Sequence, residues 1–266
     1  MITTIQYVYD FIIAIMLGIA RIYPCFILVP AFSLNVLKGM LRSAVVISLT
    51  LLPAPVIQQQ LLQAPLSWPM LPALLLKELI VGLLLALILA MPFWLFESVG
   101  ALFDNQRGAL MGGQLNPALG SDSTPLGHLL KQLIILLLVI TFGIGGLTQL
   151  LWDSYRLWPA LAWLPAPGEI GFEVYLKLLT ETFTHLVLYA GPLVALLLLL
   201  EFSISLLSLY SPQLQVFVLS MPAKCLVGMA FFVIYLPVLH YLGGQKILTL
   251  PDLKHLLPLI FRQPGN

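Results

Sequence analysis

The sequence EFSISLLSLYSPQLQVFVLSMPAK, residues 201–224, has a Ser-Pro-Gln break at Pro212 between two long apolar arms. Proline lacks a backbone N–H and disfavours helical conformation in the preceding residue, so the break predicts a turn. A continuous helix over either arm, residues 183–210 or 214–242, would run roughly 40 Å. A hydrocarbon core is about 30 Å thick. We therefore predict a helical hairpin that is longer than an ordinary membrane hairpin.

The rest of the chain is also strongly apolar. Of its 266 residues, 60% are hydrophobic and 9% are charged, with a mean hydropathy of +1.03. This composition predicts an integral membrane protein, because a soluble domain needs a more polar surface. The net charge of +1 and the lack of a Lys/Arg cluster argue against nucleic acid as a partner.

We predict an all-α membrane protein of about six hydrophobic spans, arranged as long, kinked helical hairpins. The expected spans are residues 5–34, 43–62, 79–96, 133–151, 183–210 and 214–242. Lys and Arg divide almost evenly between the two sides of this topology, so the positive-inside rule gives no orientation. Trp158 and Trp163 are expected at a membrane interface.

Four charged residues fall within the predicted spans, namely Asp10, Arg21, Glu201 and Lys224, and Arg21 and Glu201 are the candidate interior charges. Arg21 is expected to face protein, water or a carboxylate, since a charge facing lipid costs at least about 2.5 kcal/mol. Alternatively, it only marks the end of a short first helix that continues as a re-entrant segment. Glu201 either ends a span near Leu200 or is a partly buried acid within a continuous arm, where it needs a donor.

Residues 97–131 are the most polar segment of the chain and include FDNQRGALMGGQLNP, residues 103–117. One interpretation is a glycine-rich loop between spans. The other is a backbone crossing packed tightly against other chains, with Arg107 held by an acid. Asp104 and Asp122 are expected to be solvated surface carboxylates rather than an intramembrane pair.

Catalytic signatures are absent from the sequence. It contains no glycine-rich phosphate loop, no paired-histidine zinc helix and no G-x-S-x-G elbow. The four histidines share no ligand spacing, and the two cysteines lie in separate apolar runs. We expect no enzyme activity, no cofactor and no metal.

Two motifs resemble the SctT/FliR family of type III secretion and flagellar export-apparatus proteins. Residues 103–146 are similar to the family's Asp-x-Gln-Arg-Gly loop and the span after it, and residues 211–224 are similar to its Pro-Gln-Leu-Asn-Val-Phe segment with a later Pro-x-Lys. The first motif resembles the injectisome branch more than the flagellar one. This sequence departs from the family's second motif at two positions: Gln215 replaces the usual asparagine, and Leu209 stands where the family often has arginine.

The resemblance implies a bacterial inner-membrane protein that is a single-copy subunit of an export gate. Its partners would be R-type, S-type and U-type subunits and the large export-gate protein, and the gate would conduct unfolded secreted substrates. Residues 1–182 would be R-type-like and residues 183–266 S-type-like. The candidate assembly and gate residues are Arg21, Asp104, Gln106, Arg107, Gly108, Glu201, Pro212, Gln213, Phe217, Pro222 and Lys224.

A small-solute transporter or channel is the alternative function. In that hypothesis, Arg21 and Glu201 would be charges along the solute pathway. A transporter should also have polar residues inside several spans and a repeat between its halves, and the sequence has no convincing repeat.

Overall fold

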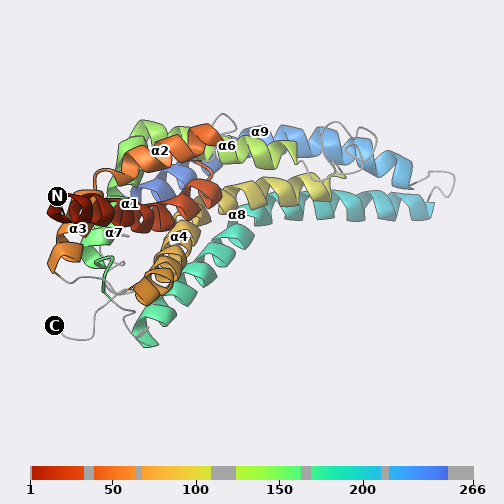
Figure 1. Cartoon of the computed structure of the whole chain (residues 1–266). Helices are drawn as coiled ribbons and strands as arrows, with labels where there is room; N and C mark the ends of the chain where they lie inside the picture. Colours follow the sequence, from red (N-terminus) through yellow and green to blue (C-terminus); the bar gives the residue numbers. More distant parts are fainter. Residues whose placement is uncertain are drawn as a thin grey trace. The chain divides into compact units, whose positions relative to one another are not determined.

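The computed structural model of the chain describes residues 2–32, 39–63, 68–108, 124–162, 169–210 and 216–250. Every regular element in these ranges is helical (Figure 1), as the sequence predicts. The α-helices are α1 (Ile2–Leu28), α2 (Met40–Thr50), α3 (Ala54–Gln63), α4 (Leu71–Gln106), α6 (Pro125–Thr141), α7 (Gly143–Leu157), α8 (Glu169–Tyr210) and α9 (Val216–Leu248), with one 3₁₀ turn at Trp68–Met70.

Helices α1, α4, α8 and α9 are each long and apolar enough to cross a membrane. Helices α2 and α3 form a pair bent by 58°, and α6 and α7 form a second bent pair, so up to six spans result. The first bend lies at Pro53, whose carbonyl accepts hydrogen bonds from the N–H groups of Val56 and Ile57 as α3 begins. The prediction of about six kinked spans is confirmed.

The polar segment 97–131 is more helical than a loop between spans would be. Helix α4 continues to Gln106, and α6 already begins at Pro125. Both helices have hydrophobic residues interspersed among the polar ones, so each helix has an apolar face that can pack against the other helix. Residues 109–123 lie outside the described residues.

The chain divides into two compact units. The first comprises Met1–Met91, Val139–Leu179 and Leu248–Asn266, and the second comprises Pro92–Leu138 and Thr180–Ile247. Fully buried core residues of the first unit include Leu17, Ile22, Phe26 and Ile57, and those of the second include Phe93, Phe96, Phe103 and Leu130. The division at residue 182 into R-type-like and S-type-like parts stays a prediction.

Helices α8 and α9 form the predicted antiparallel hairpin. The Tyr235 hydroxyl donates to the Tyr189 carbonyl at 3.3 Å, and Lys224 Nζ lies 2.8 Å from a Glu201 carboxylate oxygen. In each pair the two residue numbers average about 212. This is the pattern expected of antiparallel helices that are joined by a turn near Pro212. The helices contain 42 and 33 residues, or about 63 and 50 Å, so both exceed the thickness of a hydrocarbon core.

Candidate functional site

Arg21 of α1 and Glu78 of α4 form a buried ion pair, with side chains 1% and 0% exposed. Arg21 Nε donates to Glu78 Oε2 at 2.5 Å, and Nη2 donates to Oε1 at 2.9 Å. This two-bond geometry matches the planar guanidinium to the carboxylate. Desolvating both charges is costly, and the attraction offsets that cost only if the remaining donors also find acceptors.

Carbonyls at the end of α7 accept those remaining Arg21 donors. Nη1 donates to the Ser154 carbonyl and Nη2 to the Trp158 carbonyl, both at 3.0 Å. The Ser154 carbonyl also accepts the backbone N–H of Trp158, the residue that follows α7, and the helix dipole makes this end favourable for a cation. Arg21 therefore joins α1, α4 and the end of α7.

Lys77 completes this buried cluster. Its Nζ lies 2.6 Å from Glu78 Oε1 and donates to the carbonyls of Ala160 at 2.6 Å and Ala162 at 3.0 Å. Two cations thus share one carboxylate, and hydrogen bonds to backbone carbonyls stabilise the positive charge that this carboxylate does not balance. We call Arg21, Lys77 and Glu78 the buried charge cluster.

Close helix packing sets the position of the buried charge cluster. A Cβ at Gly82 of α4 would overlap the backbone carbonyl of Arg21, so only glycine permits this approach of α1 and α4. The Arg21 guanidinium also lies 4.1 Å from the centre of the Tyr155 ring, a cation–π contact. The Tyr155 hydroxyl donates to the Gly18 carbonyl at 2.9 Å.

These contacts confirm one prediction and overturn its alternative. Arg21 does face a carboxylate, and the alternative that it ends a short first helix is wrong, because α1 continues to Leu28. Trp158 is buried within the chain and Trp163 lies outside the described residues, so the interfacial position of both stays a prediction. Glu78 was missed as a partner because 57 residues separate it from Arg21; its position beside an apolar run was the only signal.

A second polar site joins α4 to the start of α6. Asp104 is fully buried; its Oδ1 accepts a bond from Arg107 Nε at 2.9 Å and lies 2.7 Å from Nη2. Asp104 Oδ2 accepts the backbone N–H of Leu126 at 2.8 Å. A carboxylate at a helix N-terminus satisfies a free N–H and interacts favourably with the dipole, so Asp104 caps α6.

Helices α4 and α6 pack along one seam beside this cap. Lys131 Nζ donates to Glu97 Oε1 at 2.5 Å, and a Cβ at Gly100 would overlap the backbone of Gly127. Glu97, Gly100 and Asp104 recur at helical spacing on α4, so one face carries all three contacts. The described parts of the polar segment therefore form a close antiparallel pairing of two helix ends.

The expectation that Asp104 is a solvated carboxylate is wrong. Local composition suggested exposure, but the Arg107 side chain and the α6 N-terminus replace water around the acid. Gln106 is half-buried, and Gly108 has a φ of +84°, a conformation that favours glycine. Asp122 lies outside the described residues.

The charges of the α8–α9 hairpin pair with each other. Glu201 lies within continuous helix α8 rather than at a span end, and Lys224 of α9 is its donor. Their side chains are 46% and 11% exposed. Pro222 lies inside α9 and is exposed. Pro212, Gln213 and the Phe217 side chain lie outside the described residues, and the predicted functional roles of all these residues stay predictions.

Among the residues that the structure describes, no group of three His, Cys, Asp or Glu side chains is placed to hold a metal ion. The charged side chains described above instead bind one another and backbone groups.

The sequence matches the family described as "Bacterial export proteins, family 1" over residues 12–249. The chain belongs to this family. It is 33% identical over 243 residues to "Yop proteins translocation protein T" of Yersinia pestis, covering 90% of this chain and 92% of the relative. It is 31% identical to "Surface presentation of antigens protein SpaR" of Salmonella typhimurium, covering 84% and 83%.

Flagellar members of this export family are more distant. "Flagellar biosynthetic protein FliR" of Escherichia coli is 26% identical over 192 residues, covering 69% of this chain and 71% of the relative. The predicted similarity to the injectisome branch is therefore confirmed. The chain is a multi-pass inner-membrane protein of the type III secretion export apparatus.

Proposed function

We propose that the chain is a single-copy structural subunit of the type III secretion export gate. With R-type and S-type subunits it forms the channel through which unfolded substrate proteins cross the inner membrane. The main support is similarity over about nine tenths of both chains to a translocation protein. It acts without catalysis: its described polar clusters consist of paired charges and capped helix ends.

The hairpin supplies the surface that such a subunit needs. In the most apolar windows of α8 and α9, only 22% and 17% of the residues are buried within the chain. The exposed side chains include Phe202 at 65%, Ile234 at 73% and Tyr241 at 64%. Two long apolar helices with so little of their surface buried within the chain need contact with protein or lipid, and the excess length of the helices favours protein for at least part of it.

Asp104 and Arg107 fix the polar end of the gate subunit in this proposal. The ion pair and the cap on α6 hold the two helix ends that flank residues 109–123. Pro212, Gln213 and Phe217 shape the turn of the hairpin. U-type subunits and the large export-gate protein bind the assembled complex.

The transporter alternative has less support from the candidate pathway charges. The Arg21 guanidinium already donates to one carboxylate and two backbone carbonyls and is 1% exposed, so it presents no free donor to a solute. Glu201 is paired with Lys224. Both arrangements are better suited to holding helices than to conducting ions.

Purification from native membranes tests the proposed function. A tagged chain is extracted in mild detergent, and the co-purifying proteins are identified and counted by mass spectrometry. The proposal predicts one copy of this chain with several copies of two other small membrane proteins. A chain that runs alone or as a homo-oligomer, with no heterologous membrane subunit, would support the transporter instead.

A further inference from the structure

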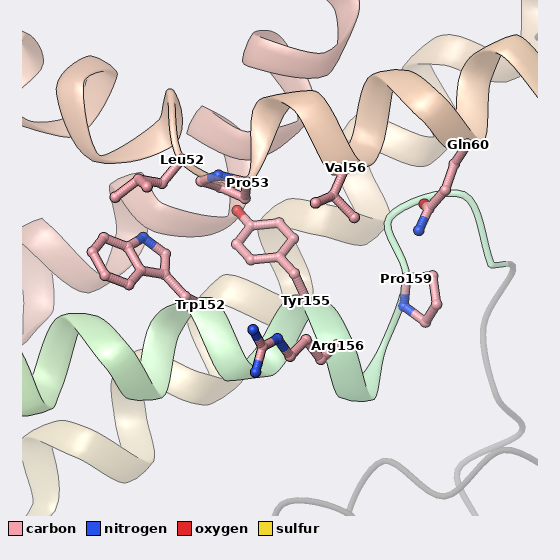
Figure 2. A pocket seen from close by; sticks show the side chains of 8 residues that line it. All are labelled: Leu52, Pro53, Val56, Gln60, Trp152, Tyr155, Arg156 and Pro159. Carbon is pink, nitrogen blue, oxygen red and sulfur yellow. The ribbon is translucent and has the colours of Figure 1, made fainter.

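A pocket of about 300 Å³ lies beside the break between α2 and α3. Figure 2 shows the side chains that line it from this break and from α7. They belong to Leu52, Pro53, Val56, Gln60, Trp152, Tyr155, Arg156 and Pro159. Its walls are mainly apolar or aromatic, with the amide of Gln60 and the cation Arg156 as the polar exceptions.

Hydrogen bonds hold the aromatic walls in place. Trp152 Nε1 donates to the Leu49 carbonyl at 3.4 Å near the end of α2, and the Tyr155 hydroxyl donates to the Gly18 carbonyl of α1. The bend at Pro53 turns α3 away from the line of α2, which opens space beside α7. The pocket is therefore formed before any ligand binds, as small-molecule sites usually are.

A second pocket of about 340 Å³ shares Trp152 and Arg156 with the first. Its lining is more polar and includes Thr148, Gln149 and Asp153. Arg156 thus borders an apolar space and a polar space. An amphipathic ligand fits this division, with its apolar part beside the α2–α3 break and its headgroup beside the polar part of α7.

The membrane topology gives both pockets access to a lipid interface. Counting each bent pair as one span, α3 ends the second span and α7 ends the fourth, so both helices end on the same side of the membrane. Tryptophan and arginine near span ends commonly lie at headgroup level. Leu52 and Val56 beside the break are 61% and 56% exposed, so acyl chains reach them without any movement of the protein.

Arg156 has donors to spare for an anionic group. Its side chain is 88% exposed, and its charged neighbour Asp153 is 3.8 Å away, too far for a strong hydrogen bond. A guanidinium has five N–H donors and binds phosphate in a two-bond geometry. Asp153 lowers the attraction for anions, so we expect moderate selectivity rather than tight binding.

We propose that this pocket binds a phospholipid with an anionic headgroup. The phosphate lies at Arg156, and an acyl chain lies over Leu52, Val56 and Trp152. The bound lipid also covers Tyr155, whose ring contacts Arg21 of the buried charge cluster. Lipid binding therefore stabilises the folded unit by mass action. This inference depends on the membrane location of the chain and not on the proposed gate function.

Quenching of Trp152 fluorescence tests the proposal. The full chain, purified in its native complex, is placed in nanodiscs that contain increasing fractions of phosphatidylglycerol with brominated acyl chains. Brominated phosphatidylcholine is the comparison lipid. We expect stronger quenching by phosphatidylglycerol, and Trp152→Phe should abolish the difference between the two lipids. Arg156→Gln should lower the apparent affinity for phosphatidylglycerol about fivefold, the effect of one basic residue near a lipid surface.

Lys177→Gln is the matched control, because it removes one exposed cation from the same unit at a site outside both pockets. It should leave the selectivity unchanged, and Arg156→Lys should restore part of what Arg156→Gln loses. Equal quenching by both lipids, or selectivity that survives Arg156→Gln, would overturn the proposal. Displacement of the lipid by inorganic phosphate, or a neighbouring protein subunit found over Trp152 by cross-linking, would also overturn it.

Discussion

The first and last pairs of long spans differ in how much of their surface the chain itself covers. In the most apolar windows of α1 and α4, 50% and 61% of the residues are buried, but the corresponding values for α8 and α9 are 22% and 17%. All four helices have similar hydropathy, between 2.0 and 2.7. Hydropathy therefore identifies the spans, whereas burial separates helices that form the chain's own core from helices whose surface needs an outside partner.

The first unit and the hairpin also differ in how deeply their charged side chains are buried. The buried charge cluster of the first unit is at most 3% exposed by residue and uses backbone carbonyls at the end of α7. In the hairpin, Glu201 is 46% exposed and has Lys224 as its ion-pair partner. Removing a charge from the first site leaves other charges buried without partners, whereas in the hairpin water reaches the 46% exposed Glu201 carboxylate.

Glu78→Gln should have the largest effect. It leaves the Arg21 and Lys77 cations together in a buried site, and breaking a buried pair costs about 3–5 kcal/mol. We expect the chain to be lost from the membrane, as measured by quantitative immunoblotting of membrane fractions. Glu173→Gln, an exposed acid on α8, is the control and should be present at the normal level. Normal levels of Glu78→Gln would mean that the buried charge cluster does not hold the first unit together.

Arg107→Ala should have the next largest effect. It removes the charged partner of the fully buried Asp104, and hydrogen bonds to charged groups contribute about 1.5–3 kcal/mol. We expect reduced thermal stability of the purified chain together with lower complex yield or secretion. Exposed Lys177→Ala should change none of these. Normal yield and secretion for Arg107→Ala would reduce Arg107 to an ordinary surface charge.

Gly82→Ala tests the close approach of α1 and α4. The added methyl group would overlap the Arg21 carbonyl, and overpacking of this kind costs about 1–3 kcal/mol. Gly191→Ala in α8, where an added Cβ has no neighbour within 4 Å, should be neutral or slightly stabilising. The melting temperature should therefore fall for Gly82→Ala and stay unchanged or rise slightly for Gly191→Ala. Equal behaviour would show that the helices separate easily at Gly82.

Glu201→Gln should have the smallest effect on the isolated chain. The Glu201 carboxylate is 46% exposed, and a glutamine oxygen in its place still accepts a hydrogen bond from the less exposed Lys224 Nζ. Exposed ion pairs contribute about 0.2–1 kcal/mol, so the melting temperature should change little. If another subunit covers the hairpin, the same substitution should destabilise the assembled complex more than the isolated chain. Equal melting shifts for chain and complex would place Glu201 outside any interface.

Sequence alone predicted the helical class, the number of spans and the long hairpin, because these follow from hydropathy and from the proline break. It also predicted the kind of partner that Arg21 needs, because an unpaired charge in a span is costly. It did not identify Glu78, since nothing local links residues that are 57 positions apart. Asp104 was misjudged because polar neighbours in the sequence suggested water, whereas the α6 N-terminus and Arg107 surround it in space.

Site-specific photo-cross-linking in native membranes tests the central claim, that other protein subunits cover the hairpin. A benzoyl-phenylalanine residue replaces Phe202 or Tyr241, which are 65% and 64% exposed, and therefore keeps an aromatic ring at each site. The account predicts light-dependent adducts with heterologous small membrane proteins at both positions, identified by mass spectrometry. Adducts with lipid alone at both positions, in cells that secrete normally, would contradict it.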